Sequence, residues 1–464
     1  MTTSTMLIAL TLCAAPAIPS HAQTFKNLAS FDGSNGSGPW YTSLVQGADG
    51  MFYGSTRVGG TYGSGAMFKI STSGTVTVLH SFCAKANCPD GRGPIGALIL
   101  GTDGDFYGTT EFGGGKPDKG TVFKITAGGA LTTLHSFCSH TGCPDGAQPY
   151  TGLVLGTNGN FYGTTYAGGT DDEGTVFQMA PSGTLTTLHS FNYTTDGAFP
   201  YGALVQAANG DFYGTTYEGD TTGYGTLFKI TAAGKLTTLH NFQSTDGAYP
   251  EGALIQAANG KLFGTTYNGG ANGYGAIFEA TLAGAVTLVH SFAATGGAYP
   301  VSGVIQATDG NLYGTTAYTG SGETGYGTVF EFTSGGALTP LHTFADTDGA
   351  YVADGLVQGT DGSFYGTTYE GGTDSIGTVF NISTGLKAFV RTVPTSGKVG
   401  TAVTILGSDL TSASKVTFNG TMAAFTVKSA TEITATVPAS ATTGTVKVVT
   451  TGGTLSSNVS FRVP

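Results

Sequence analysis

One stretch sets the period of this sequence: Gly210-Asp211-Phe212-Tyr213-Gly214-Thr215-Thr216-Tyr217. Versions of it occur seven times between residues 23 and 384, about 50 residues apart, and such a period is typical of propellers and solenoids. The second aromatic residue of the motif falls at Tyr53, Tyr107, Tyr162, Tyr213, Phe263, Tyr313 and Tyr365. The sequence therefore predicts one object assembled from seven copies of the same small unit.

Each copy predicts four short strands. In the fourth copy they cover residues 202–206, 212–217, 225–230 and 236–240, which are rich in Thr, Val, Phe and Tyr and bounded by Gly or Asx. An Asp-Gly or Asn-Gly pair separates the first two strands of every copy, and this pair tolerates the positive φ angles of a tight hairpin. The 77 glycines suit many turns, and no helical periodicity of useful length is present.

The phase of the repeat predicts that the two ends of this region meet. Residues 28–31 match the fourth-strand segment 239–242, whereas the last copy stops after its third strand at 379–382. An N-terminal strand would complete the last blade and hide its edge. We therefore predict an all-β fold, with a seven-bladed β-propeller of four-stranded blades over residues 23–384. An open β-solenoid, which needs no such closing strand, is the alternative.

The repeat motif ends at residue 384, and a different pattern of short strands follows. Residues 385–393 form a predicted linker, and residues 394–464 contain short strands at 416–418, 424–427, 433–437, 446–449 and 459–463. Turn residues lie between them, among them Asn419-Gly420 and Gly452-Gly453. About 70 residues of this kind suit an Ig-like β-sandwich.

Residues 1–22 resemble a secretory signal peptide, with an apolar core at 6–12 and a small-x-small cleavage site at Ser20-His21-Ala22. The first five residues carry no Lys or Arg, which is atypical. Cys13 offers lipidation as an alternative, but Leu12 is large for the position before a lipidated cysteine. No other segment reaches the ~18 apolar residues of a membrane span. We expect a secreted or extracytoplasmic protein without a membrane span.

Four cysteines follow the signal region, in two pairs at the same place in the second and third copies. Cys83 and Cys88 bracket one short insertion, and Cys138 and Cys143 bracket the other. The pattern predicts two local disulfides formed in an oxidising compartment. A zinc site built from all four thiolates is the alternative, although the C-x4-C spacing is loose for zinc.

The charge balance excludes one class of partner. The formal net charge is −11, with only 18 Lys and Arg residues. Proteins that bind nucleic acid need a clustered basic surface to track phosphates, so we expect no nucleic-acid partner.

Short sequence elements place the chain beside a known family. The Phe-Tyr-Gly-Thr-Thr, Gly-Thr-Val-Phe and Leu-His-Ser-Phe elements resemble the Gloeo/Verruco (GloVer) tandem repeat of secreted bacterial proteins over residues 25–384. The tail resembles an IPT/TIG domain through Pro394-x-Ser396-Gly397, Phe418-Asn419-Gly420 and Val437-Pro438. The resemblance implies a secreted repeat protein and brings no catalytic residues with it.

A histidine and an aspartate recur in most copies, and we interpret both as structural. Chemistry needs one convergent constellation, whereas a residue that returns in every blade more often bonds neighbouring strands. The aspartate is expected to cap its own turn. We expect no cofactor; a repeated calcium site at these aspartates is the alternative. The histidines are His80, His135, His189, His240, His290 and His342, and the aspartates are Asp32, Asp90, Asp145, Asp196, Asp246 and Asp348.

Functional residues are sought where the copies differ at one shared position. Directly after the crossover proline, at the predicted mouth of the channel, the aligned residues are Trp40, Ile95, Tyr150, Tyr201, Glu251, Val301 and Ala353, with Asp354 beside the last. Aromatic faces on one arc and carboxylates on another suit a sugar. Four tyrosines that open the loops after the second strands would extend the platform: Tyr166, Tyr217, Tyr267 and Tyr369. In the alternative interpretation these rings only pack the loops together.

The predicted function is non-catalytic binding of an extracellular polysaccharide, matrix material or a surface protein. A polysaccharide-degrading enzyme is the alternative. In a glycoside hydrolase, Glu251 and Asp354 would be the acid and base. A lyase would need a basic neutraliser, for which Arg57, Arg92, Lys116 and Lys119 are the candidates. A purely structural repeat protein is the third hypothesis.

Overall fold

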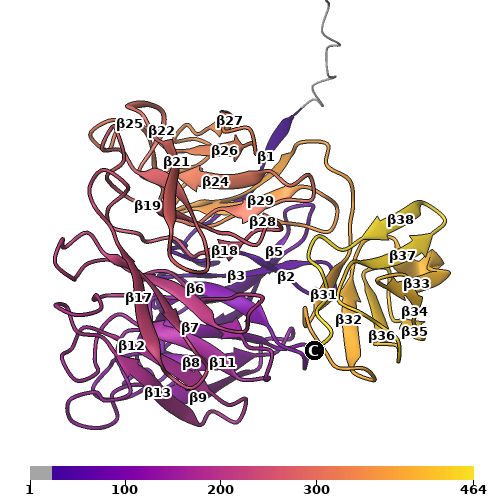
Figure 1. The fold of residues 1–464 in the computed structure, drawn as a ribbon, viewed down its shortest axis with the longest axis horizontal. Helices are drawn as coiled ribbons and strands as arrows, with labels where there is room; N and C mark the ends of the chain where they lie inside the picture. Colours follow the sequence, from indigo (N-terminus) through magenta and orange to yellow (C-terminus); the bar gives the residue numbers. More distant parts are fainter. Residues whose placement is uncertain (1–22) are drawn as a thin grey trace, which may run out of the picture.

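The computed structural model describes residues 23–464, whose regular structure is β apart from one short 3-10 turn, Leu410–Ser412. Each copy of the repeat forms a four-stranded antiparallel sheet. The fourth copy contains β14 (Val205–Gln206), β15 (Phe212–Thr216), β16 (Thr226–Ile230) and β17 (Leu236–Asn241), in that order. Strands β15 and β16 are buried, whereas β17 is half-exposed, so β17 is the outer strand. Figure 1 shows the sheets following one another in the order of the sequence.

Residues 24–383 hold seven four-stranded sheets in total, plus one small two-stranded sheet. The other strands are β1 (Thr24–Ser30); β2 (Val45–Gln46), β3 (Phe52–Thr56), β4 (Ala66–Ile70), β5 (Val76–Ser81); β6 (Arg92–Leu100), β7 (Phe106–Phe112), β8 (Thr121–Ile125), β9 (Leu131–Ser136); β10 (Val154–Leu155), β11 (Phe161–Thr165), β12 (Thr175–Met179), β13 (Leu185–Ser190); β18 (Ile255–Gln256), β19 (Leu262–Thr266), β20 (Ala276–Ala280), β21 (Val286–Ser291); β22 (Thr295–Ala298), β25 (Tyr318–Gly320); β23 (Ile305–Gln306), β24 (Leu312–Thr316), β26 (Thr328–Phe332), β27 (Leu338–Thr343); β28 (Val357–Gln358), β29 (Phe364–Thr368) and β30 (Thr378–Ser383).

The predicted pairing of the two ends is confirmed. Strand β1 pairs antiparallel with β30, and the sheet order is β1-β30-β29-β28. Phe25 on β1 stacks on His342 of the preceding sheet, with 3.6 Å between ring centroids. The N-terminal strand thus supplies the outer strand of the last sheet, the place that β17 holds in the fourth copy.

Neighbouring sheets are joined by their aromatic residues. The tyrosine of one motif stacks on the first aromatic residue of the next motif, as Tyr53 does on Phe106 with centroids 4.1 Å apart. The same contact between Tyr365 and Phe52, at 3.9 Å, joins the last copy to the first. Because the two aromatics of the motif are adjacent on one strand, their side chains point to opposite faces of the sheet and reach both neighbours.

A second inter-sheet contact comes from the glutamine that ends the first strand. The side-chain oxygen of Gln256 accepts the backbone N–H of Ala208 in the preceding copy, at 2.8 Å. Gln46 accepts the N–H of Thr360 at 3.0 Å, so this contact too joins the last copy to the first. Glutamines 206, 306 and 358 make the same bond. In six copies the first strand is a two-residue ladder element, shorter than predicted, whereas in the second copy it is the nine-residue β6.

Residues 391–456 form two further four-stranded sheets packed as a sandwich. Val403 and Ile405 of one sheet and Val416 and Val446 of the other share one buried core. The strands are β31 (Arg391–Val393), β32 (Ala402–Leu406), β36 (Glu432–Thr436) and β35 (Phe425–Val427) in the first sheet, and β34 (Thr421–Met422), β33 (Lys415–Phe418), β37 (Val446–Thr450) and β38 (Gly453–Ser456) in the second.

The C-terminal unit differs from its predicted layout in two places. Strand β31 lies inside the predicted linker and ends at Val393, because Pro394 has no N–H to continue a ladder. The proline thus ends the first strand of the sandwich instead of preceding it. The chain turns at 451–452, close to the predicted turn, but the strand that follows, β38, was not predicted. The predicted strand 459–463 makes only isolated bridges at Phe461 and Arg462.

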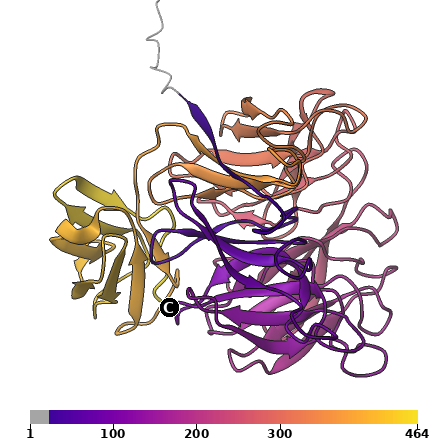
Figure 2. The ribbon, with the colours of Figure 1, turned by 180° about the vertical axis from the view of Figure 1, so that it is seen from behind.

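The sandwich lies against the Asx-Gly turns of the repeats, a surface we call the turn face. Thr431 donates to the carbonyl of Ala48 at 2.6 Å, and Arg462 donates to the carbonyl of Ala207 at 3.3 Å. Ala48 and Ala207 belong to the first and fourth copies, so the sandwich reaches across this face. Both views show the yellow unit beside the repeats (Figure 1, Figure 2). The opposite surface, with the longer loops after the second strands, is called the loop face.

Candidate functional site

All seven copies meet around one central cavity of about 150 Å³. In six copies the segment just before the first strand contributes to its wall, and in the second copy residues within β6 do so. One residue from each copy is Tyr41, Ala97, Tyr150, Tyr201, Glu251, Val301 and Ala353. The cavity therefore lies on the axis on which the sheets converge.

Glycine residues of the wall allow the backbones of neighbouring copies to approach each other closely. A Cβ on Gly252 would lie 2.4 Å from the amide nitrogen of Gly303, and a Cβ on Gly303 would lie 2.1 Å from the carbonyl oxygen of Ala253. Such distances exclude any larger residue, because the backbones of adjacent copies touch there. The larger side chains of the wall are the aromatic and acidic residues before the first strands and a few aliphatic residues such as Ile255, Ile305 and Leu356.

The first copy carries one extra residue after its crossover proline. Counted back from Gln46 and Gln206, Tyr41 matches Tyr201, and Trp40 is the insertion. Tyr41 lines the cavity, whereas Trp40 packs outside it against Tyr369, with centroids 4.4 Å apart. The alignment from the proline placed Trp40 on the ring; alignment from the first strand would have found Tyr41.

Glu251 is the carboxyl group of the cavity wall. It is 9 % exposed, and the Tyr41 hydroxyl donates to its Oε2 at 2.7 Å. Burial raises the pKa of Glu251 to about 7, partly opposed by the bond from Tyr41. Burial therefore favours the protonated form of this carboxyl more than in an exposed glutamate.

Asp354 is buried in a different environment. It is 1 % exposed; the Thr42 N–H donates to Oδ1 at 2.7 Å, and the Thr367 hydroxyl donates to Oδ2. Burial raises the pKa of Asp354 to about 7. The hydrogen bonds act in the opposite direction, but their effect on the pKa is smaller than that of burial. Asp354 does not line the cavity among the described residues. It joins the last copy to the first, one residue away from the Tyr41 contact with Glu251.

Four of the predicted tyrosines form one half-buried arc over the third and fourth copies. Ring centroids are 5.1 Å apart for Tyr150 and Tyr166, 5.3 Å for Tyr166 and Tyr201, and 5.0 Å for Tyr201 and Tyr217. We call these residues the tyrosine arc. Two of them, Tyr150 and Tyr201, also line the cavity.

The other two predicted tyrosines lie apart from the arc. Tyr267 packs beside Tyr299, with centroids 5.1 Å apart, and donates to Glu323 at 2.8 Å. Tyr369 belongs to the group around Trp40 and Tyr351. Contacts through Tyr299, Tyr318 and Tyr351 connect these two tyrosines into one second aromatic group. Tyr41, which contacts both Trp40 and Tyr201, joins this group to the arc.

An ion pair flanks the arc in the first two copies. Arg57 contacts Glu111 at 2.9 Å, and Glu111, with a 2 % exposed side chain, also accepts the Tyr150 hydroxyl at 2.8 Å. Arg57 and Glu111 occupy the position of Tyr166 in their own copies, directly after the second strand's Thr-Thr or Ser-Thr pair. Glu111 was missed because only the tyrosines of this position were considered. Arg92, another predicted base, pairs with Asp118 at 2.6 Å.

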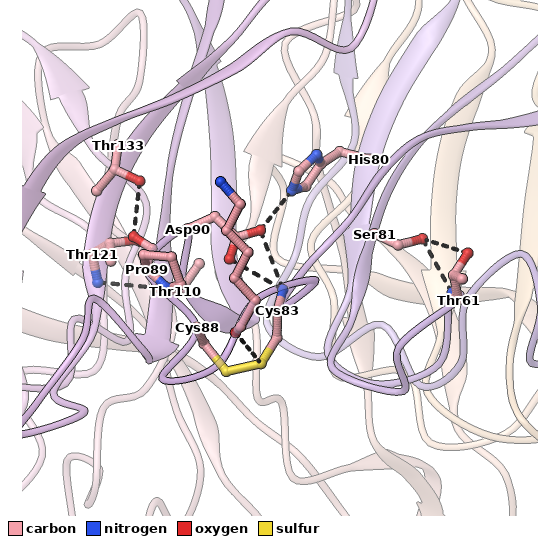
Figure 3. A network of polar contacts seen from close by, with 11 residues as sticks. Thr61, His80, Ser81, Cys83, Cys88, Pro89, Asp90, Thr110, Thr121 and Thr133 are labelled. Carbon is pink, nitrogen blue, oxygen red and sulfur yellow. Dashed lines mark hydrogen bonds and ion pairs between the residues drawn. A yellow bond between two sulfur atoms is a disulfide. The ribbon is translucent and has the colours of Figure 1, made fainter.

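The recurring histidines and aspartates bond to each other. His80 Nε2 lies 2.9 Å from Asp90, which also accepts the Cys83 N–H at 3.2 Å (Figure 3). Equivalent pairs form in four other copies. The predicted disulfides Cys83–Cys88 and Cys138–Cys143 are both present. Across residues 23–464, no three His, Cys, Asp or Glu residues gather in a way that could hold a metal ion.

No helix within residues 23–464 has the length and apolarity to cross a membrane.

The fold is similar to known extracellular domains. Those of two putative hybrid two-component systems from B. thetaiotaomicron each superpose with a TM-score of 0.53 at 12 % identity. The matches cover 91 % and 94 % of this chain but only 52 % and 59 % of theirs. A fungal alcohol oxidase in complex with copper is more distant, with a TM-score of 0.47 at 13 % identity over 95 % of this chain and 94 % of its own. The likeness to the two extracellular domains shows a β-propeller-like fold and nothing of function.

No curated protein matches the sequence. The model of one family does: the Gloeobacter/Verrucomicrobia repeat matches residues 83–259 and again 253–433. The two tandem matches cover more than half of the chain and include the motifs with which the sequence analysis began. This protein belongs to the Gloeobacter/Verrucomicrobia repeat family.

Proposed function

We propose that this is an extracytoplasmic, non-catalytic binding protein that recognises carbohydrate at the loop face of a closed seven-bladed propeller. The observation that carries the proposal is the tyrosine arc, which borders a central cavity with one buried carboxyl group, Glu251. The two disulfides favour an oxidising compartment outside the cytoplasm. The predicted signal peptide lies outside the described residues.

The propeller part of the proposal rests on closure. A cavity lined by all seven copies, the β1–β30 pairing and the Gln46–Thr360 bond all join the first copy to the last. An open solenoid would leave these contacts unmade. We propose further that the C-terminal sandwich is an Ig-like IPT/TIG domain, which its two packed four-stranded sheets favour.

Carbohydrate suits the chemistry of the arc. The C–H faces of a sugar stack on aromatic rings, while its hydroxyls bond to oxygen and nitrogen groups. Half-buried tyrosines offer both, because each ring presents a face and a hydroxyl. Glu251 adds an acceptor within the cavity, and the Arg57–Glu111 pair adds polar atoms at one end of the arc.

A polysaccharide-degrading enzyme is the second candidate, and the pKa of Glu251, raised to about 7, favours it as a general acid. Canonical glycoside hydrolysis needs two carboxyl groups that face each other within about 10 Å. Asp354 is a poor second group, because both of its oxygens accept internal hydrogen bonds outside the cavity. Arg57 is a poor neutraliser for a lyase, because it already pairs with Glu111. We therefore rank binding above catalysis.

The test is incubation of the purified chain, residues 23–464, with plant, algal and bacterial polysaccharides. Binding without catalysis predicts that at least one insoluble polymer retains the protein while its chain length stays unchanged. Shortened polymer, or new ultraviolet absorbance from unsaturated ends, would establish an enzyme instead. Retention should fall at least tenfold in Tyr201→Ala and stay unchanged in Tyr62→Ala, which alters an exposed tyrosine outside the arc.

A further inference from the structure

The cavity at the centre of the ring combines aromatic faces with one acid. Tyr41, Tyr150 and Tyr201 line it together with Glu251. The rings are close neighbours: the centroids of Tyr41 and Tyr201 are 6.1 Å apart, and those of Tyr150 and Tyr201 are 5.4 Å apart. The remaining wall consists mainly of Gly, Ala, Ser, Thr and aliphatic residues. The site is therefore a small aromatic enclosure with one carboxyl group inside it.

No basic side chain balances this carboxyl group in the described part of the chain. The titratable groups that face Glu251 are four tyrosines: Tyr41, Tyr201, Tyr217 and Tyr351. Residues 23–464 contain no ion pair to Glu251, and Arg57 pairs with Glu111. Only one carboxyl oxygen, Oε2, accepts the Tyr41 hydroxyl. A buried acid without a cation is costly, and a cationic ligand would remove that cost.

Aromatic rings around the acid favour the same ligand. The face of a tyrosine ring attracts a cation within about 6 Å of its centroid, and aromatic enclosures recognise alkylated ammonium groups in this way. A cavity of about 150 Å³ accommodates a group of a few heavy atoms and not a whole polymer. A saccharide stacked along the tyrosine arc could place one substituent into it.

We infer that the cavity binds an organic ammonium group, and that the carbohydrate recognised on the loop face carries free amino groups. The second clause rests on the proposed function; the first does not. Glu251 would form the ion pair with the ammonium group, while Tyr41, Tyr150 and Tyr201 surround its carbon atoms. A neutral glycan is the competing ligand, and it would leave the carboxyl group unpaired.

The first experiment uses two small probes of similar shape, tetramethylammonium and neutral tert-butanol, titrated into residues 23–464 and followed by calorimetry. The cation should bind at least tenfold more tightly than the alcohol. Its charge does not change with pH, so only the protein can supply a pH dependence. Ionisation of Glu251 through its pKa of about 7 should make binding about tenfold stronger at pH 8 than at pH 6. Equal affinity for both probes, or a flat pH profile, would overturn the inference.

The second experiment uses Glu251→Gln, which keeps an acceptor for Tyr41 and removes the charge. It should reduce tetramethylammonium affinity at pH 8 at least tenfold and abolish the pH dependence. Glu370→Gln is the matched control, since it removes the same charge from an exposed residue of the loop face, and it should change affinity less than twofold. Equal losses in both variants would mean a long-range charge effect and would also overturn the inference. If a variant folds poorly, the wild-type pH profile still tests the inference, because it is measured without any substitution.

The third experiment compares oligomers of glucosamine, N-acetylglucosamine and glucose. The amine-bearing oligomer should bind best, and Glu251→Gln should remove its advantage. Equal binding of all three in both proteins would leave the carbohydrate function standing and refute the amine specificity. Binding of tetramethylammonium through Glu251, with no binding of any oligomer or polymer, would support the ammonium site and refute the carbohydrate function.

Discussion

The turn face and the loop face of the repeats are built on opposite rules. On the turn face the same contacts return around the ring: the motif tyrosine bonds to the Asx of its turn, as Tyr213 does to Asn209 at 2.9 Å, and most first strands end in a glutamine that bonds to the preceding copy. The C-terminal sandwich also contacts this face. On the loop face the His–Asp pairs also repeat, but the aligned position at the cavity differs between copies and holds tyrosine, isoleucine, glutamate, valine or alanine.

This contrast separates two kinds of position: those that join neighbouring copies and those that line the cavity. A contact between neighbouring copies must be made by every copy, so its residues repeat. A side chain at the mouth of the cavity meets its counterparts across the axis, and different residues can fill that space. Variable positions on a rigid scaffold are where binding residues concentrate. If the repeated contacts hold the copies together, the contacts that close the ring should contribute most to stability and a single repeated hydrogen bond least.

Removal of β1 should cause the largest loss. Deleting residues 23–30 exposes the edge of β30 and unstacks Phe25 from His342, so we expect a loss on the order of 5 kcal/mol in unfolding free energy, with aggregation through the open edge. Thermal unfolding and size-exclusion chromatography measure both. A synthetic peptide of residues 24–30, added in trans, should restore part of the stability. An unchanged melting temperature would mean that the frame does not need its closing strand.

The Asp354→Asn variant should change how stability depends on pH. Because the pKa of Asp354 in the folded protein is raised from 3.8 to about 7, its neutral form favours the folded state, and this contribution is lost as pH rises through about 7. Between pH 5 and pH 8 the wild type should lose on the order of 3 kcal/mol more than the variant. Denaturant unfolding across this range provides the measurement. Parallel pH profiles would show that the carboxyl group is not neutral in the folded protein.

Loss of one disulfide should have a smaller effect, confined to the loop face. Cys83→Ser with Cys88→Ser opens a loop with a sequence separation of 5, for which chain entropy predicts a loss of about 2 kcal/mol. The equivalent double variant at Cys138 and Cys143 is the matched comparison, and the two losses should agree within about 1 kcal/mol. Unequal losses, measured by denaturant unfolding, would mean that the two stapled loops have different roles.

A single repeated hydrogen bond should matter least. Gln256→Leu introduces the residue that the second and third copies already have at this position, Leu100 and Leu155, and it frees the exposed Ala208 N–H. We expect a loss of no more than about 1 kcal/mol. The reverse change, Leu155→Gln, should be neutral or slightly stabilising, because it can accept the Thr102 N–H. A loss above about 2 kcal/mol in Gln256→Leu would indicate that the glutamines hold the ring together cooperatively.

Much of the frame could be predicted because it is periodic. Each strand of the repeat occurs seven times, so an error at a single position does not change the predicted pattern. The closing strand β1 and both disulfides followed from the phase of the repeat and from paired insertions. The C-terminal unit has no such repetition, and there strands β31 and β38 were not predicted and the strand expected at 459–463 forms only isolated bridges.

The candidate site was harder to predict because its residues come from different copies. An insertion of one residue moved Tyr41 into the place assigned to Trp40, and no local signal distinguishes the two. Glu111 became visible only through its contacts with Arg57 and Tyr150. Asp354, a ligand-binding candidate and the partner of Glu251 in the enzyme alternative, accepts hydrogen bonds from Thr42 and Thr367.

The sequence by itself determined the repeat, its strands, its tight turns and the pairing of its ends, because those depend on local patterns of apolar residues, glycine and Asx. Only the tertiary structure decided which side chains share the central cavity and which acids are buried there. Burial and convergence depend on how all the copies close around one axis. The pKa of Glu251, raised by that burial, is therefore a property of the closed ring and not of the fifth copy alone.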